Sequence, residues 1–95
     1  MRTVNRLLLN EITKNSRCII CNKQNPDPHH WKSKGSGGDD VEYNLMPLCR
    51  MHHTQCHTMG ATTFSQKYQQ VTNWLMKNGW YFDYDIGKWF HDNKK

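Results

Sequence analysis

The chain has 95 residues and a formal net charge of +5, and Leu, Ile, Val and Phe together supply only 16 of those residues. This length accommodates one domain, and no apolar run approaches the roughly 20 residues that a membrane span needs. So small a core stabilises a domain weakly. The four Cys and six His are therefore candidates for additional cross-links, through disulfides or a bound metal ion.

The elements expected in the first half of the chain are short. Apolar residues at helical spacing predict a short helix or an extended arm over residues 1–15. Residues 25–28, Asn-Pro-Asp-Pro, predict a turn, because each proline pushes the residue before it out of the α region. A short strand is expected over 29–31, a flexible glycine-rich loop over 34–40, and an edge strand or irregular segment over 44–48.

The second half of the chain predicts two helices and a hairpin. The first helix is expected over 50–60, and apolar residues on one face predict a second, continuous helix over about 62–79. Aromatic runs on either side of a turn predict a β-hairpin over 80–91. The expected fold is a single α+β domain, with a motif core over 18–60 and an added helix and hairpin over 62–91.

The cysteines allow either a disulfide framework or a metal site. The opening residues lack the apolar stretch of a signal peptide, which favours a cytoplasmic protein with reduced thiols. Cys18-x-x-Cys21 and Cys49-x-x-His52 have the spacing of two knuckles that clasp one tetrahedral ion. We expect these four residues to hold a structural Zn²⁺. Cys56 is the competitor for the fourth place and is otherwise expected in the core.

Four of the remaining histidines form a second pattern: His29, His30, His53 and His57. His53 and His57 are four residues apart on an expected helix and therefore share a face. His29 and His30 are adjacent on an expected strand and point to opposite faces, so at most one of them joins the helical pair. Three imidazoles leave positions open on a metal ion, which suits stabilisation of a charged phosphoryl transition state.

The stretch from Cys18 to His57 resembles the HNH (ββα-metal) nucleases. The matching parts are Cys18-x-x-Cys21, His29-His30, the loop over 35–40, Asn44-Leu45, Pro47-Leu48-Cys49, His52-His53 and His57. The paired knuckles are similar to those of the zinc-ribbon branch of that family, many of whose members are phage-encoded.

The resemblance implies a β-hairpin and a helix that clasp one catalytic metal ion. His30 matches the general base, and Asn44 matches the asparagine that orients this base and fixes the loop. His53 matches a metal ligand, and His29 takes a ligand position that Asp often holds. His57 matches the extra metal-binding histidine of the colicin-type DNases.

Two positions depart from the zinc-ribbon pattern. His52 stands in place of the usual fourth cysteine, and His29 stands in place of the common Asp. The second change removes a negative charge from the site. Three imidazoles suit Zn²⁺, Ni²⁺, Co²⁺ or Mn²⁺ better than Mg²⁺, which prefers oxygen ligands, so the catalytic metal stays open among these five ions.

These features predict a metal-dependent DNA endonuclease or nickase of low sequence specificity. His30 is expected to accept a proton from the attacking water, since histidine changes charge near neutral pH. The resemblance implies products with 5′-phosphate and 3′-hydroxyl ends. The main alternative is a non-catalytic, zinc-stapled nucleic-acid-binding module, and a toxin-like nuclease is a third.

The basic balance of the chain favours DNA as the partner, with no membrane, and a monomer or weak dimer is expected. Lys32, Lys34 and Arg50 flank the motif and are the expected phosphate contacts. Two roles are open for the acidic residues of the same region, partners of the metal ligands or a solvated loop, and we expect the loop; they are Asp39, Asp40 and Glu42. The protein is expected in the cytoplasm, where a phage-encoded chain would also act in its host.

Overall fold

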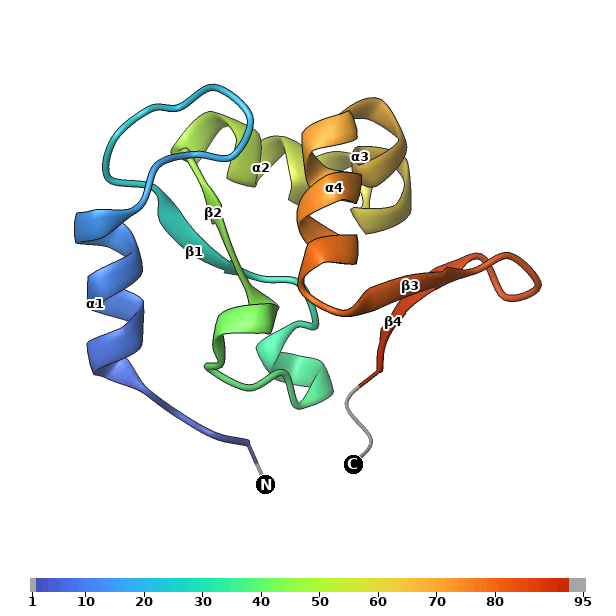
Figure 1. Cartoon of the computed structure of the whole chain (residues 1–95), viewed down its shortest axis with the longest axis horizontal. Coiled ribbons are helices and arrows are strands. Elements are labelled where there is room, and N and C mark those ends of the chain that lie inside the picture. The colour runs from blue at the N-terminus through green and yellow to red at the C-terminus, as the bar shows by residue number, and fades with distance from the viewer. Residues whose placement is uncertain (1, 93–95) are drawn as a thin grey trace.

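The structure is a computed structural model, and it describes residues 2–92. Four short α-helices, two 3₁₀ turns and two pairs of strands make up a small α+β fold over the described residues, and Figure 1 shows their arrangement. The helices are α1 (Arg6–Asn15), α2 (Arg50–Met59), α3 (Ala61–Lys67) and α4 (Gln69–Lys77), with 3₁₀ turns at Lys34–Ser36 and Glu42–Asn44. The strands are β1 (Asp27–His30), β2 (Leu45–Leu48), β3 (Trp80–Asp83) and β4 (Lys88–His91).

The first sheet consists of β1 and β2, which pair antiparallel with His29 opposite Met46 and Asp27 opposite Leu48. Helix α2 begins directly after β2, with Cys49 as its N-cap residue. The expected turn over 25–28 is therefore shorter than predicted, because Asp27 and Pro28 already belong to β1. Pro28 is tolerated there because β1 is an edge strand of a two-stranded sheet.

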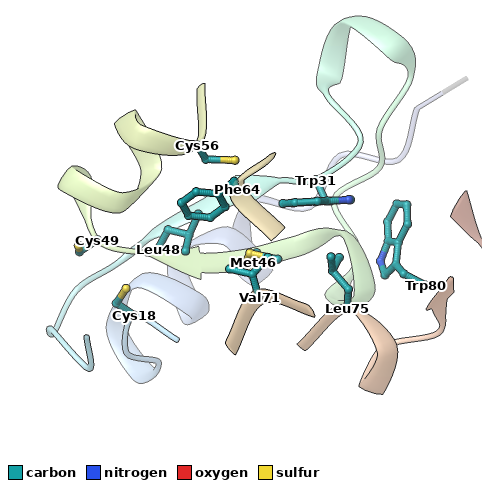
Figure 2. Close-up of a cluster of buried hydrophobic side chains, with 10 residues drawn as sticks. All are labelled: Cys18, Trp31, Met46, Leu48, Cys49, Cys56, Phe64, Val71, Leu75 and Trp80. Carbon is teal, nitrogen blue, oxygen red and sulfur yellow. The ribbon is translucent and has the colours of Figure 1, made fainter. Parts of the chain in front are cut away.

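The hydrophobic core lies between the first sheet and helices α3 and α4 (Figure 2). Met46 and Leu48 point from β2 toward Phe64, Val71 and Leu75, and all five side chains are fully buried. The apolar face predicted from sequence for the second helix is thus the face that packs.

The prediction of one continuous helix over 62–79 is wrong, because the helix is interrupted at Tyr68. This residue has an extended backbone, with φ −117° and ψ 113°, and separates α3 from α4. The break brings the Tyr68 hydroxyl within 2.6 Å of Oε1 of Gln55 on α2, to which it donates a hydrogen bond. Thr72 donates to the freed carbonyl of Ser65 at 2.8 Å. Side-chain partners thus replace helix hydrogen bonds lost at the break.

The predicted C-terminal hairpin is present as β3 and β4, and it projects from the body of the molecule (Figure 1). Two indole N–H groups fasten it: Trp80 donates to the carbonyl of Tyr43 at 2.7 Å, and Trp89 donates to Oγ of Ser65 at 2.9 Å. Among residues 2–92, no helix is long and apolar enough to cross a membrane.

Candidate functional site

A first cluster of metal-ligating side chains joins the knuckle near the N-terminus to the start of α2. Its members are Cys18, Cys21, Cys49 and His52, whose ligand atoms all lie within 4.8 Å of one another. The sulfur atoms of Cys21 and Cys49 are 3.7 Å apart, and Nδ1 of His52 lies 3.2 Å from the Cys49 sulfur. Ligands about 2.3 Å from a tetrahedral zinc ion are separated by about 3.8 Å, so the donor set fits zinc.

Local backbone hydrogen bonds shape the knuckle around this cluster. The N–H of Cys18 donates to the carbonyl of Lys23 at 3.0 Å, and the N–H of Asn22 returns to the carbonyl of Cys18 at 2.9 Å. Asn22 has a positive φ of 67°, which asparagine tolerates better than most residues. The tight turn aims both cysteines of the knuckle at the same point.

The environment of the cluster favours the metal-binding forms of two of its side chains, Cys18 and His52. Burial alone raises the pKa of the Cys18 thiol, but hydrogen bonds from neighbouring backbone N–H groups more than offset this and lower it. Burial also lowers the pKa of His52, which keeps its imidazole neutral. A thiolate and a neutral imidazole are the species that bind zinc.

Cys56 does not join this cluster. It lies in the hydrophobic core, as expected, with its sulfur 3.6 Å from Nε2 of His29. Burial raises the pKa of the Cys56 thiol to about 11, so it stays protonated at neutral pH. His52, one turn into α2, occupies the fourth place in the donor set instead.

A second cluster is formed by His29, His53 and His57, again with ligand atoms within 4.8 Å of one another. The centroid of the His29 ring lies 4.8 Å from that of the His53 ring and 5.1 Å from that of the His57 ring. The Nε2 atoms of His53 and His57 are 3.2 Å apart. Nitrogen ligands about 2.1 Å from one ion are separated by about 3.0–3.4 Å, so these two imidazoles fit a shared metal.

Burial makes His29 suited to metal binding. Its side chain is enclosed by the sheet and α2, and burial together with the neighbouring His53 and His57 lowers its pKa to about 3. The imidazole is therefore neutral over the physiological range, with an electron pair available. His53 is half-buried and His57 is exposed, so one side of the cluster faces solvent.

Asp27 is a member of this site that the sequence analysis missed. Its Oδ2 atom lies 2.9 Å from Nδ1 of His53, which leaves Nε2 of His53 directed at His57. Arg50, an expected phosphate contact, pairs with the same carboxylate at 3.0 Å. Asp27 and His29 are two residues apart on β1 and therefore share a face. The two-residue spacing would have indicated Asp27 if the predicted strand over 29–31 had begun earlier and included Pro28.

His30 lies beside this cluster but is not part of the donor set. Its Nε2 atom is 2.6 Å from Oδ1 of Asp40, a carboxylate whose side chain is 1% exposed. The expectation that Asp40 belongs to a solvated loop is therefore wrong. Its loop folds back so that the carboxylate is buried, and a buried carboxylate needs partners.

The N-terminal segment supplies the other partners of Asp40. The N–H of Asn5 donates to Oδ2 of Asp40 at 2.8 Å, and the Arg2 guanidinium donates to Oδ1 at 3.1 Å. Burial alone raises the pKa of Asp40, but the hydrogen bonds from His30 and Asn5 and the charge of Arg2 lower it overall. Asp40 is therefore an ionised carboxylate that faces His30.

Asn44 fixes the loop that carries this carboxylate. Its Oδ1 atom accepts from the N–H of Lys32 at 2.7 Å, and its Nδ2 atom donates to the carbonyls of Lys32 and Asp39, each at 3.1 Å. Asn44 therefore holds the chain on either side of the loop, whereas Asp40 is the residue that contacts the His30 ring.

The three expected phosphate contacts lie at the surface but do not form one patch of equivalent residues. Lys32 and Lys34 are exposed in and just before the first 3₁₀ turn. Arg50 is exposed at the start of α2, and its charge is shared with Asp27. Unlike Arg50, the two lysines share their charge with no carboxylate among residues 2–92.

Comparisons with known proteins support the assignment of the chain to a nuclease family. Residues 4–80 match the family described as "Putative HNHc nuclease". The uncharacterized protein YdfU of Escherichia coli (strain K12) is 36% identical over 58 residues, which are 58% of this chain and 16% of YdfU. No solved structure matches the chain at a significant level. Because the family match covers well over half of the sequence, the chain belongs to the HNHc nuclease family.

Proposed function

We propose that the protein is a metal-dependent DNA endonuclease or nickase that hydrolyses phosphodiester bonds with His30 as the general base. The observation that carries this proposal is the division of the adjacent histidines. His29 clusters with two histidines of α2, whereas His30 is hydrogen-bonded to a buried carboxylate. A metal ligand and a proton acceptor are thus kept side by side but separate, as this chemistry requires.

In this proposal, β1, β2 and α2 form a ββα-metal core of the zinc-ribbon, phage-type branch. The cluster of Cys18, Cys21, Cys49 and His52 would hold a structural zinc ion, because four protein ligands leave no position for substrate. Such a site contributes to folding directly, which compensates for the small hydrophobic core. The motif core would span 18–60 and the supporting helices and hairpin 62–91, in one domain.

The second cluster would hold the catalytic divalent ion through His29, His53 and His57. When bound, such an ion would supply positive charge against the phosphate and the departing oxygen. Three imidazoles are compatible with Zn²⁺, Mn²⁺, Ni²⁺ or Co²⁺, with Mg²⁺ the least suited. Asp27 would orient His53 by accepting a hydrogen bond from its Nδ1.

His30 would act through Nδ1. Donation of Nε2–H to Asp40 places the free electron pair on Nδ1, for which residues 2–92 show no hydrogen bond. Nδ1 takes a proton from water as the water oxygen bonds to phosphorus. The P–O3′ bond breaks and O3′ takes a proton from solvent, to which protonated His30 then releases its own, leaving 5′-phosphate and 3′-hydroxyl ends. Asp40 positions the ring and stabilises its charged form, and Asn44 positions Asp40 through the loop.

Low sequence specificity follows in this proposal from contacts to the backbone. Lys32, Lys34 and Arg50 would contact phosphates, which supplies affinity without reading bases. A cytoplasmic monomer or weak dimer acting on DNA is the setting we infer.

Cleavage of supercoiled plasmid tests the proposal. The protein is incubated with each of the five divalent ions, and nicked and linear products are quantified. His30→Ala should reduce cleavage by about 10²–10⁴-fold while both metals stay bound and DNA affinity is unchanged. Thr54→Ala, an exposed neighbour of His53 on α2, is the matched control and should cleave normally.

Two results would contradict the proposal. Binding of DNA without cleavage under any of the five ions would favour the non-catalytic binding module. Loss of the exchangeable metal from the His30→Ala variant would show that the roles of His29 and His30 are exchanged.

A further inference from the structure

A cavity of about 720 Å³ separates the C-terminal hairpin from the loop that follows β1. Its walls carry an unusual share of aromatic and basic side chains, among them Trp31, Lys32, Tyr81, Lys88, Trp89 and Phe90. A volume of this size lies in the range of ligand-binding pockets. None of the roles described above for the two metal clusters uses it.

The cavity adjoins the three-histidine cluster. Trp31 lines the cavity, and its ring centroid lies 6.0 Å from that of His29, with the rings nearly perpendicular. On the other side, Ala61 lines the cavity at the start of α3, four residues after His57. Figure 2 shows Trp31 and Trp80, which both line the cavity, at the same end of the hydrophobic core. Trp31 is therefore the residue that connects the cavity with the three-histidine cluster.

The hairpin presents an aromatic pair to this space. Tyr81 and Phe90 are direct partners across β3 and β4, with ring centroids 6.2 Å apart, and both line the cavity. Tyr81 is 52% exposed and Phe90 is 36% exposed, although the chain has few large apolar residues with which to build a core. Exposed aromatic faces next to a candidate phosphate-hydrolysis site are suited to stacking on bases.

The charge around the cavity matches a nucleic-acid strand. Lys32 and Lys88 both line the cavity, the first from the loop after β1 and the second from the hairpin. The one carboxylate among the lining residues, that of Asp39, accepts a hydrogen bond from the N–H of Thr3 at 2.6 Å. Basic side chains that alternate with aromatic rings along a groove are typical of proteins that bind single strands.

We infer that this cavity binds unpaired nucleotides of single-stranded DNA next to the scissile phosphate, with a base stacked on Tyr81 and Phe90. The inference rests on the proposed nuclease function and names its substrate class. Bases inside a duplex are stacked on each other and cannot reach the hairpin rings without being unpaired. The preferred substrate is therefore DNA with a single-stranded segment, such as a flap, gap or open junction.

Binding by the full-length His30→Ala protein tests this without cleavage. Fluorescence anisotropy compares a labelled oligodeoxythymidine of about 12 nucleotides, within the usual site size, with a duplex of equal length. Tyr81→Ala and Phe90→Ala should each weaken binding to the single strand by about 5- to 100-fold, as expected for lost stacking. Binding to the duplex should change by less than about twofold.

Two controls separate stacking from a general effect on the fold. Tyr84→Ala removes an aromatic ring that is 88% exposed on the same hairpin but does not line the cavity, and it should bind like the parent. Tyr81→Phe and Phe90→Tyr keep the ring and should restore tight binding. Fluorescence of the lining tryptophans Trp31, Trp80 and Trp89 should be quenched as the single strand binds.

Equal losses for single strand and duplex, or no loss in either alanine variant, would overturn the inference. So would sedimentation in which Tyr81→Ala converts a stable dimer to a monomer, since the aromatic pair would then contact a second copy. Because binding is measured in a protein without its general base, failure of the nuclease proposal appears only in plasmid cleavage. Failure of the present inference appears only in the comparison of single strand with duplex.

Discussion

Oδ1 of Asp40 lies 2.6 Å from Nε2 of His30, closer than any other polar side-chain pair in the candidate catalytic site. The contact determines which nitrogen of the imidazole carries a proton and which is free. It also ties the general base proposed for β1 to the N-terminal segment, because Asn5 and Arg2 donate to the same carboxylate. The N-terminal segment therefore helps to define the candidate catalytic site.

Asp40→Asn should lower kcat by about 10- to 100-fold, the usual effect of removing a group that orients a functional imidazole. The pKa of Asp40 is lowered, so the carboxylate is negative at neutral pH and accepts a hydrogen bond from the His30 ring. An amide can present either its oxygen or its nitrogen to the ring, so it no longer fixes which ring nitrogen is free. Single-turnover cleavage at neutral pH and thermal unfolding of the same variant measure the effect. A reduced rate that is accompanied by a matching loss of Tm would indicate a purely structural role.

Cys18→Ser should damage folding and not only activity. The lost thiolate weakens a site whose metal binding can supply about 10–16 kcal/mol of folding free energy. Thermal unfolding and elemental analysis should show a lower Tm and less zinc. Cys56→Ala is the matched control, because Cys56 is a buried cysteine outside the cluster, and it should retain zinc. Wild-type stability and zinc content in Cys18→Ser would refute the assignment.

The sequence predicted most of the secondary structure because its signals were local. The knuckle spacing and the i, i+4 histidines on α2 fix which side chains meet, and both groups come together. The break at Tyr68 could not be predicted, because the contact that accompanies it is a hydrogen bond to Gln55, thirteen residues away. The apolar spacing on either side of it is equally compatible with one helix.

The sequence predicts the partners of the histidines less well than the histidines themselves. Its signals place Asp27 in a turn between prolines, and for Asp40 they favour a solvated, glycine-rich loop over a role beside the site. Each is instead held by tertiary contacts, Asp27 by α2 and Asp40 by the N-terminal segment. Such contacts between distant segments leave no periodic pattern in the chain.

Lys34→Ala should weaken binding to unrelated duplexes by similar factors. A lost phosphate contact reduces the dependence of log K on log salt by about 0.9 for duplex DNA. Titrations of two unrelated sequences at several salt concentrations measure this slope. Lys77→Ala, an exposed lysine at the end of α4, is the control and should leave the slope unchanged. A loss confined to one of the two sequences would indicate base readout by Lys34.

His53→Ala should separate the two metal sites. The four-ligand site keeps all its donors, whereas the three-histidine site loses one of three. The variant should therefore retain one tightly bound zinc and lose the exchangeable ion, with partial rescue of cleavage at high metal concentration. Metal analysis after dialysis, with and without a prior soak, distinguishes the sites. At most one metal per wild-type chain after soaking would contradict two sites.

Asp27→Asn should weaken the exchangeable metal without emptying the site. The carboxylate accepts from Nδ1–H of His53, which fixes the tautomer that offers Nε2 to the ion. Partners of this kind typically contribute 10- to 100-fold to metal affinity. Competition with a chromogenic chelator should show a loss in that range, while the zinc at the four-ligand cluster stays bound.

Asp27 also pairs with Arg50, so the loss of affinity needs to be assigned to one of two contacts. Arg50→Ala supplies the control, because it leaves the Asp27–His53 hydrogen bond in place. The arginine is 83% exposed, and an ion pair at the surface contributes little, typically below about 1 kcal/mol. Metal affinity in Arg50→Ala should therefore remain close to wild type. Equal losses in both variants would mean that Asp27 acts by holding the start of α2 rather than by orienting His53.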